Sequence, residues 1–340
     1  MVGSEGYFLG VFIANPSEGA SLEPVREIDK EEYGSYVGDV EVTLACRSDY
    51  RQFTMIRHAY VEYVRELRRY EEMLAGPVPF DEILEDDLVH TLNRRLRGFF
   101  SELRVFLDNT QTKLKRRYGK DSGRWRVFKA ACAHQFDNSF AYRFVYGLRN
   151  YAVHVNLPLN AVSLTSSQEA FDPEDPSTRN QLRVEIDRDM LLREFDWRSD
   201  VRSGLEELPP RFELGPYVDK AMACLEKIHI EFFCAKLPDE QRAAERLLAL
   251  AGSAGGPGTP CVFRVGGQEP IVNGVVLQTD AFSDGSDDEP DCTGVHIGWI
   301  PVEVAGMVVG LPEAQEIRTH EHIDWEIRDA TPRSDGEVLG

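Results

Sequence analysis

The sequence predicts an α+β protein, dominated by a four-helix bundle, with short β elements and a small β-rich C-terminal module. Long stretches in which apolar residues recur every three or four positions predict the helices, and short β-branched runs near both ends predict the strands. The chain has 340 residues, 42% of them hydrophobic and 10% aromatic. This is enough apolar material for a sizeable core and predicts two or three domains.

The N-terminal segment, residues 1–48, is predicted to be β structure. The apolar run at 7–15 and the run at 36–46, in which Val40 and Leu44 are apolar, both look like strands. The two runs are expected either to form a small hairpin or to pair with strands that come later in the chain.

Residues 49–251 are predicted to form the helical bundle. The first helix is expected from about Tyr50 to Ala75, where Gly76-Pro77 ends an apolar stripe. The second is expected over 81–117, with Asp81 near its N-cap and leucines and phenylalanines on one face.

The third helix is expected to run without interruption from Arg124 to about His154, with Pro158 stopping it. A β/loop insertion is predicted at about 157–214. The fourth helix is expected from Pro216, and 239–251 extends or follows it.

The C-terminal part of the chain changes in composition. The Gly-rich stretch 251–258 reads as a flexible linker and a domain boundary. Short β-branched runs, interrupted by an acidic loop at 283–291, predict a small β-rich domain over 259–328. The tail 329–340 is predicted to be disordered.

The net charge of −20 argues against a general nucleic-acid coat protein. The charge is uneven, however, since residues 94–129 hold twelve Lys or Arg and three acidic residues and carry +9, which leaves −29 for the remainder. An RNA track of phosphate-binding side chains and an ordinary charged helix face are equally good interpretations. The candidate RNA-binding residues are Arg94, Arg97, Lys113, Arg116, Arg117 and, near the end of the third helix, Arg143.

A cytoplasmic protein is expected, with no membrane association. No stretch approaches the roughly 18 apolar residues of a membrane span, and the first residues lack the pattern of a signal peptide. The six cysteines are widely spaced and include no CxxC pair, so they are expected to be free thiols.

The end of the aromatic third helix is unusual because it carries a group of polar residues. On an ideal helix Arg143, Asn150 and His154 share a narrow sector, whereas Arg149 lies about 140° from His154. Arg149 must therefore reach round with its long side chain, or the helix must distort. A histidine can exchange a proton near neutrality and an arginine can bind a phosphate, so together they can perform phosphodiester chemistry without a metal.

At these residues the sequence resembles the HEPN superfamily. Its catalytic members carry an Arg, often followed directly by Asn, and a His four to six residues further on, near the end of a long helix in a four-helix bundle. Arg149, Asn150 and His154 match this pattern with four residues between the Arg and the His. The residues from Phe140 to His154 also look like the motif helix of bacterial family members.

The resemblance implies a homodimer that brings two Arg/His pairs into one cleft and cuts RNA by attack of its own 2′-hydroxyl on the adjacent phosphate. His154 would be the general acid or base, Arg149 would stabilise the charged phosphorane, and Asn150 would orient either group. A role as a toxin or an anti-phage defence effector is also implied, and with it a neutralising or regulatory protein partner. Neither a metal nor a cofactor is expected.

Three other interpretations stay open. Arg149 and Asn150 could cap or salt-bridge the bundle while His154 bonds a carbonyl, as in inactive family members. The same cleft could belong to a non-catalytic HEPN module that binds RNA, a nucleotide or a protein. Alternatively, the acidic tail domain could recruit a basic protein partner.

Weaker candidates carry little chemistry. His320 and His322 would share one face of a strand without a clear third metal ligand. The acidic loop lacks the spacing of an EF-hand. The absence of GxxxxGK[ST] and GxSxG motifs disfavours a nucleoside triphosphatase and a serine hydrolase.

Overall fold

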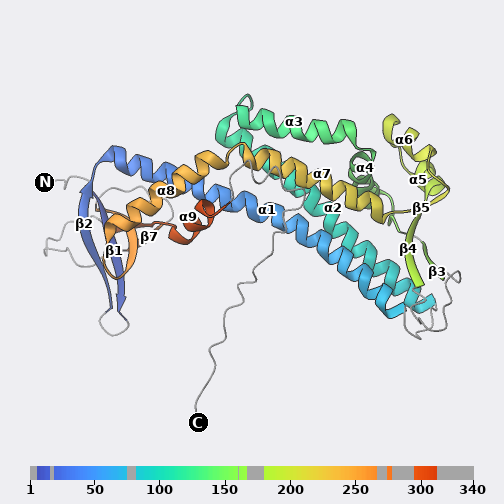
Figure 1. The fold of residues 1–340 in the computed structure, drawn as a ribbon, viewed down its shortest axis with the longest axis horizontal. Helices are drawn as coiled ribbons and strands as arrows, with labels where there is room; N and C mark the ends of the chain where they lie inside the picture. The colour runs from blue at the N-terminus through green and yellow to red at the C-terminus, as the bar shows by residue number, and fades with distance from the viewer. Residues whose placement is uncertain are drawn as a thin grey trace, which may run out of the picture.

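The computed structural model describes residues 6–15, 19–74, 82–159, 161–166, 180–265, 274–277 and 295–311. The described chain is mainly α-helical with two small antiparallel sheets, which confirms the predicted fold class. The molecule is elongated, with most helices at one end and the larger sheet at the other (Figure 1). The acidic loop, His320, His322 and the tail 329–340 lie outside the described residues.

Two long antiparallel helices, α1 (Lys30–Leu74) and α2 (Glu82–Tyr118), run along the molecule. At 1.5 Å per residue, the 45 residues of α1 extend about 68 Å. The helix therefore reaches from the larger sheet to the far end of the bundle (Figure 1). Helix α2 begins and ends within one residue of its predicted bounds.

The predicted strand at 36–46 is wrong, because these residues belong to α1, which begins at Lys30 and not near Tyr50. The side chains buried there are Tyr36, Asp39, Val40, Thr43 and Cys46, whose spacing of three and four is helical. Val40, Val42 and Leu44 alternate as in a strand, but the residues that are buried follow the helical period.

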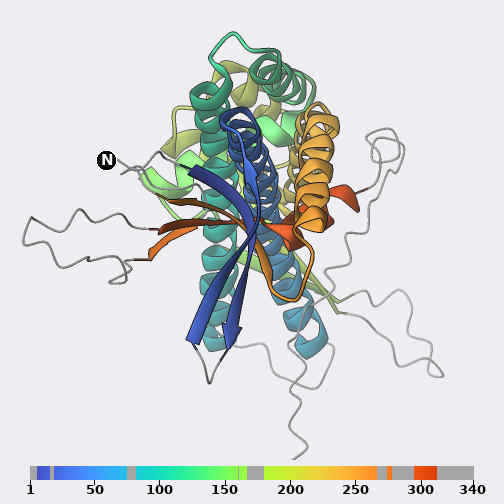
Figure 2. The same ribbon diagram turned by 90° about the vertical axis from the view of Figure 1, so that its left-hand side faces the viewer.

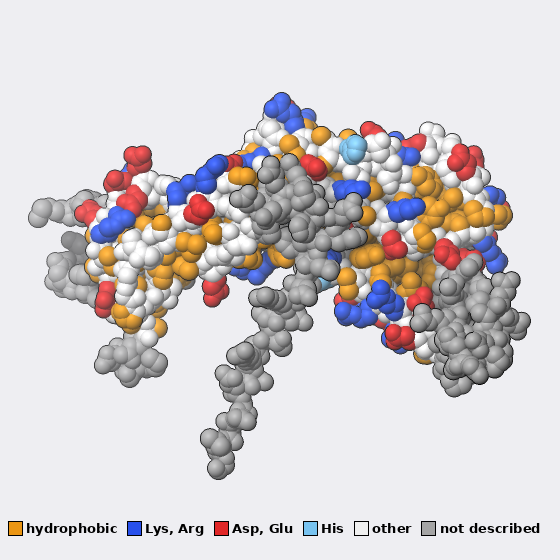
Figure 3. Space-filling view, in the orientation of Figure 1, with side chains coloured by type: hydrophobic (Ala, Val, Ile, Leu, Met, Phe, Trp, Pro, Cys, Tyr) orange, Lys and Arg blue, Asp and Glu red, His pale blue; other side chains and the backbone are white. Residues whose placement is uncertain are grey.

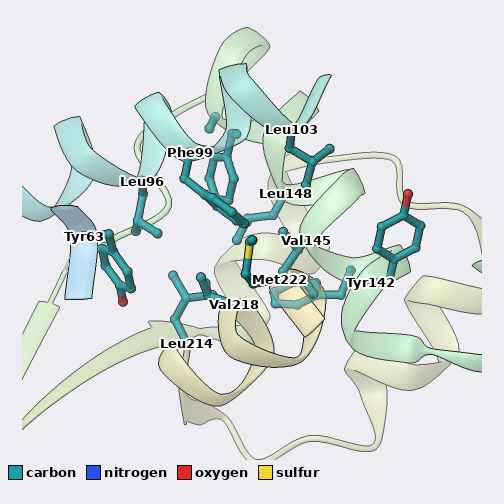
Figure 4. Close-up of a cluster of buried hydrophobic side chains, with 14 of the residues drawn as sticks. Tyr63, Leu96, Phe99, Leu103, Tyr142, Val145, Leu148, Leu214, Val218 and Met222 are labelled. Carbon is teal, nitrogen blue, oxygen red and sulfur yellow. The ribbon is translucent and has the colours of Figure 1, made fainter. Parts of the chain in front are cut away.

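Three further helices complete the bundle: α3 (Gly123–Asn138), α4 (Phe140–His154) and α7 (Gly215–Cys234). Helix α4 packs against α2 and α7, and α3 packs on α7 and α2. Figure 4 shows the resulting core, in which side chains of α1, α2, α4 and α7 converge. Those labelled are Tyr63, Leu96, Phe99, Leu103, Tyr142, Val145, Leu148, Leu214, Val218 and Met222.

The segment between α4 and α7, where a β/loop insertion was predicted, holds short strands and two short helices. A three-stranded antiparallel sheet consists of β3 (Ala161–Ser166), β4 (Asn180–Asp187) and β5 (Arg211–Glu213). Between β4 and β5 lie two short helices, α5 (Arg188–Glu194) and α6 (Ser199–Glu206), and α6 packs against α4. The insertion thus covers one side of the predicted motif helix.

The larger sheet combines both ends of the described chain in the order β2-β1-β6-β8-β7. The N-terminal hairpin of β1 (Gly6–Asn15) and β2 (Gly19–Ile28) pairs through β1 with β6 (Thr259–Val265). Strands β8 (Val295–Trp299) and β7 (Gly274–Leu277) complete it. Figure 2 views this sheet from its own end of the molecule. Pairing of the first strand with a later one was among the expected alternatives.

A second core joins this sheet to the first part of α1. Helices α8 (Leu237–Ala254) and α9 (Val302–Val309) pack on each other and on α1. Leu9 and Val262 of the sheet and Val40 of α1 are buried in this core. Among the described residues, no helix combines the length and the apolar character needed to cross a bilayer.

Candidate functional site

A break at Ser139 divides the predicted third helix into α3 and α4. The Ser139 hydroxyl accepts a hydrogen bond from the Tyr142 backbone N–H at 3.2 Å, and the Ser139 N–H donates to the Gln135 carbonyl at 3.0 Å. Ser139 thus caps both helices. The prediction of one uninterrupted helix over 124–154 is wrong, because the serine takes an extended conformation and α4 turns away from α3 (Figure 1).

Arg143 spans this break. Its Nη1 donates to the carbonyls of Phe136 at 2.6 Å and Asp137 at 2.9 Å, and its Nε lies 3.2 Å from Oδ2 of Asp200 on α6. The side chain thus links the end of α3, the start of α4 and the insertion. Its predicted phosphate contact stays a prediction that competes with these bonds.

The motif residues lie in the last two turns of α4. Nη1 of the half-buried Arg149 donates to Oδ1 of Asn150 at 2.9 Å, so the structure brings these two predicted residues together. His154 is the last residue of α4 and is exposed. The helix runs regularly to His154, so the distortion considered from the sequence does not occur. Arg149 and His154 therefore point about 140° apart, while Asn150 and His154 share one face.

A pocket of about 620 Å³ lies beside α4, between α2, α3 and the turn that joins α5 to α6. Asn150 lines it together with Arg143 and Gly147 from the same face of α4, whereas Arg149 and His154 do not line it. Six aromatic side chains form much of its wall: Phe128, Phe136, Tyr142, Tyr146, Phe195 and Trp197. Because His154 follows Asn150 by one turn, it lies about 6 Å further along the same face.

The position of Trp197 depends on a glycine. Its indole Nε1 donates to the Leu191 carbonyl at 2.8 Å, and its ring stands edge-on to Phe195 at 4.9 Å between centroids. A Cβ atom on Gly147 would lie 2.8 Å from Cζ3 of Trp197. Glycine at this position therefore lets the indole reach α4 and close one side of the pocket.

Charged groups surround the mouth of the pocket. Arg104 pairs with Asp108 at 2.7 Å and lies over the ring of Tyr146, and Arg198 lies over the ring of Phe136 at 4.7 Å. Burial alone would raise the pKa of Asp200, but hydrogen bonding and the charge of Arg198, together with the charge of Arg143, lower it overall. Burial raises the pKa of the Cys132 thiol to about 12, so this pocket residue is a neutral thiol.

The chain that follows the motif is held by residues that the sequence reasoning missed. The Tyr151 hydroxyl donates to Oε2 of Glu194 at 2.8 Å, which ties α4 to α5. The side-chain amide of buried Asn93 donates a hydrogen bond to the Leu159 carbonyl and accepts one from the Leu159 backbone N–H. A polar residue in the apolar series Val89, Asn93 and Leu96 was the available signal for this role.

The predicted RNA-binding residues of α2 do not form one cluster. Arg94, Arg97 and Arg116 are exposed, but Arg94 and Arg116 lie about 33 Å apart along the helix. Lys113 instead bonds Ser48 and Gln52 of α1, each at 3.0 Å, while Arg117 lies over the ring of Tyr118. Figure 3 shows basic side chains at the top of the view, above the α2–α3 turn.

The chain matches none of the protein-family models, the curated proteins or the solved structures with which it was compared. The resemblance to the HEPN superfamily accordingly remains a proposal. It depends on the Arg149, Asn150 and His154 pattern and on the position of that pattern at the end of α4.

Proposed function

We propose that the protein is a metal-independent endoribonuclease of the HEPN type, with its active site at the C-terminal end of α4. One observation carries the proposal. The Arg149 guanidinium is bonded to Asn150 beside an aromatic pocket, and an exposed histidine follows one turn later on the face of Asn150. One helix end of the bundle thus carries both a cation that can bind phosphate and a group that can transfer a proton.

The proposed reaction needs only these groups and the RNA itself. The 2′-oxygen attacks the adjacent phosphorus, the bond from phosphorus to the 5′-oxygen breaks, and the products are a 2′,3′-cyclic phosphate and a 5′-hydroxyl. His154 takes the proton from the 2′-hydroxyl or returns one to the leaving oxygen. Arg149 stabilises the extra negative charge of the phosphorane, and Asn150 orients the guanidinium.

A homodimer belongs to this proposal. Arg149 and His154 point about 140° apart on one helix, so a second copy provides the means of placing an arginine and a histidine on the same phosphate. The residues on either side of His154 support a contact there, because Val153 is 50% exposed and Val155 is 42% exposed. These two side chains would supply apolar area to such a contact.

The proposed setting is cytoplasmic. The five described cysteines, Cys46, Cys132, Cys224, Cys234 and Cys261, are free thiols, as expected for a reducing compartment. A role as a toxin or an anti-phage effector, with a neutralising or regulatory partner, depends on the resemblance to the superfamily alone.

The test is cleavage of a mixed RNA pool in EDTA by the wild type and by Arg149→Ala and His154→Ala, with analysis of the product ends. We expect 2′,3′-cyclic phosphate ends with the wild type and a loss of at least about 100-fold in rate with either variant. His134→Ala, which removes an exposed histidine of α3, is the matched control and should cleave normally. The proposal fails if the wild type does not cut, or if cutting is indifferent to His154.

A second candidate is a non-catalytic binding module that uses the same helix end. The observation in its favour is that Arg149 and Asn150 already bond each other and are only half exposed. Equilibrium binding of RNA that is equal for the wild type and His154→Ala, without cleavage by either protein, would select this alternative.

A further inference from the structure

The pocket beside α4 has the size and the wall of a site for a flat aromatic group. Its volume of about 620 Å³ lies within the range of small-molecule sites, roughly 300–1,000 Å³. Aromatic side chains reach it from α3, α4 and the α5–α6 turn. The walls are pre-formed, since Phe136 meets both Tyr142 and Tyr146 edge-on, each at 6.4 Å between ring centroids.

Nucleobases suit such a wall, because every base has a π-face that stacks on an aromatic side chain. The pocket also holds polar groups that can meet the edge of a base. The Asn150 amide carries a donor and an acceptor, and Asp137 and Asp196 contribute carboxylate acceptors. At its mouth, Arg104, Lys129 and Arg198 place cations where a charged backbone would pass.

The pocket lies next to the Arg149, Asn150 and His154 motif, and this distance limits which part of an RNA the pocket can hold. Asn150 lines the pocket and also accepts the hydrogen bond from Arg149, so the same residue belongs to both places. His154 follows about 6 Å along the same face, a separation on the scale of one nucleotide. A base held in the pocket would therefore leave its own phosphate near His154, and the arginine that meets the same phosphate would come from the second copy of the proposed dimer.

We propose that this pocket receives one unstacked base of a single-stranded RNA and thereby selects the phosphate that is cut. The inference rests on the proposed function for the cutting step, but the binding of the base is a separate property. It implies that the substrate is single-stranded, since a base within a duplex is stacked and paired and cannot enter.

A bulky residue at the mouth of the pocket tests this directly. Ala133 of α3 is exposed and lines the pocket, so Ala133→Trp can fill it without removing a core contact. Ala130→Trp is the matched control, because Ala130 is exposed on the same helix and does not line the pocket. Tyr146→Leu is a second variant that removes one aromatic wall.

The probes are fluorescein-labelled 2′-O-methyl RNA ten-mers, which lack the attacking hydroxyl, and an abasic ten-mer with the same phosphates. Fluorescence anisotropy should show the wild type binding the base-bearing ten-mer about tenfold more tightly than the abasic one. Ala133→Trp and Tyr146→Leu should lose this preference, and Ala130→Trp should keep it. Equal binding of both probes by the wild type, or a full preference in Ala133→Trp, would overturn the inference.

Two further outcomes separate this inference from the proposed function. RNA cleavage that is lost in His154→Ala, combined with no preference for base-bearing probes, overturns the base pocket alone. Preference for base-bearing probes that Ala133→Trp abolishes, combined with no cleavage by the wild type, supports the base pocket and overturns the nuclease. Tight binding of free nucleoside 5′-monophosphates, without binding of either ten-mer, would identify a free-nucleotide site and overturn the RNA inference.

Discussion

Asn93 of α2 and Leu159, five residues beyond the end of α4, exchange a pair of hydrogen bonds. The Asn93 Nδ2 donates to the Leu159 carbonyl at 2.8 Å, and the Leu159 N–H donates to the Asn93 Oδ1 at 3.1 Å. Nδ2 also reaches the Val89 carbonyl at 2.9 Å, and the amide is buried. The segment that leaves the proposed catalytic helix is thus fixed to the bundle through one side chain.

Asn93→Ala should destabilise the protein by about 2–4 kcal/mol, because it leaves a buried N–H and a buried carbonyl of Leu159 without partners. Urea unfolding measures the loss. Faster hydrogen exchange at residues 155–159 should accompany it, since their anchor is gone. Asn109→Ala on the exposed face of α2 is the control and should change stability by less than about 0.5 kcal/mol. A loss that small for Asn93→Ala would show that the anchor contributes little.

Gly147→Ala should destabilise the protein by about 1–3 kcal/mol, although alanine is the better helix former. The new methyl group would lie 2.8 Å from Trp197 and must push the indole away from the Leu191 carbonyl. The matched control is Gly98→Ala in α2, where a Cβ meets nothing within 4 Å and should stabilise by up to about 1 kcal/mol. Thermal unfolding of both variants checks the sign. Equal stabilisation by the two substitutions would contradict the proposed role of Gly147.

The sequence predicts the long helices well where one apolar stripe is uninterrupted. The predicted span of 81–117 agrees with α2, Glu82–Tyr118, because the leucines and phenylalanines there follow only the helical period. At 36–46 some apolar residues are two positions apart and others are three or four apart, so the pattern fits a strand as well as a helix. The strand prediction there is wrong, because the segment belongs to α1. At Ser139 the stripe of Phe136, Phe140 and Phe144 continues across a break that depends on a single cap. The cluster Asp137-Asn138-Ser139 was the local warning.

The candidate site could be predicted only in its local part. The hydrogen bond between Arg149 and Asn150 joins neighbours in the chain, so a contact between them could be predicted from the sequence. The pocket was not, because Trp197 reaches α4 from the insertion, about 50 residues along the chain, and depends on the space left by Gly147. The anchoring of Leu159 by Asn93 likewise joins positions 66 residues apart. Contacts at this range leave little trace in the local pattern of one sequence.

Lys236 forms a buried ionic cluster at the break between α7 and α8. Its Nζ lies 2.7 Å from Oε1 of Glu240 and 3.1 Å from Oδ2 of Asp49, and the side chain is only 2% exposed. Burial alone would lower the pKa of Lys236, but the charges of Glu240 and Asp49 raise it overall, so the ammonium is retained. The cluster joins α1 to both helices where the two cores of the molecule meet.

Lys236→Ala should cost about 3–5 kcal/mol, since it leaves the buried carboxylate of Glu240 without its cation. The double variant Lys236→Met with Glu240→Leu removes both charges and should recover most of that loss, because Asp49 keeps its contact with Lys113. Urea unfolding of the single and double variants forms the test. If the double variant is less stable than Lys236→Ala, lost packing and not an unpaired charge explains the effect.

The buried imidazole of His229 should make stability depend on pH. Its ring stacks on Phe53 at 3.9 Å between centroids, and burial, aided by the charge of Lys236, lowers its pKa to about 3. An unfolded histidine titrates near 6.5. Between these values the unfolded chain binds a proton that the folded chain refuses, so this group stabilises the fold fully above about pH 6.5 and its contribution is lost as the pH falls toward 3.

His229→Leu should therefore flatten the decline in the free energy of unfolding between pH 7 and pH 4.5, by up to about 1.4 kcal/mol per pH unit below pH 6. The difference in the free energy of unfolding between the variant and the wild type at each pH removes the contribution of the carboxylates, which both proteins share. Urea unfolding at pH 7, 5.5 and 4.5 measures the two slopes. The same substitution at His58 of α1, which is exposed, is the matched control for replacing a histidine by leucine. Parallel slopes for the wild type and His229→Leu would mean that the folded protein binds this proton as readily as the unfolded chain, which would contradict the burial of a neutral imidazole.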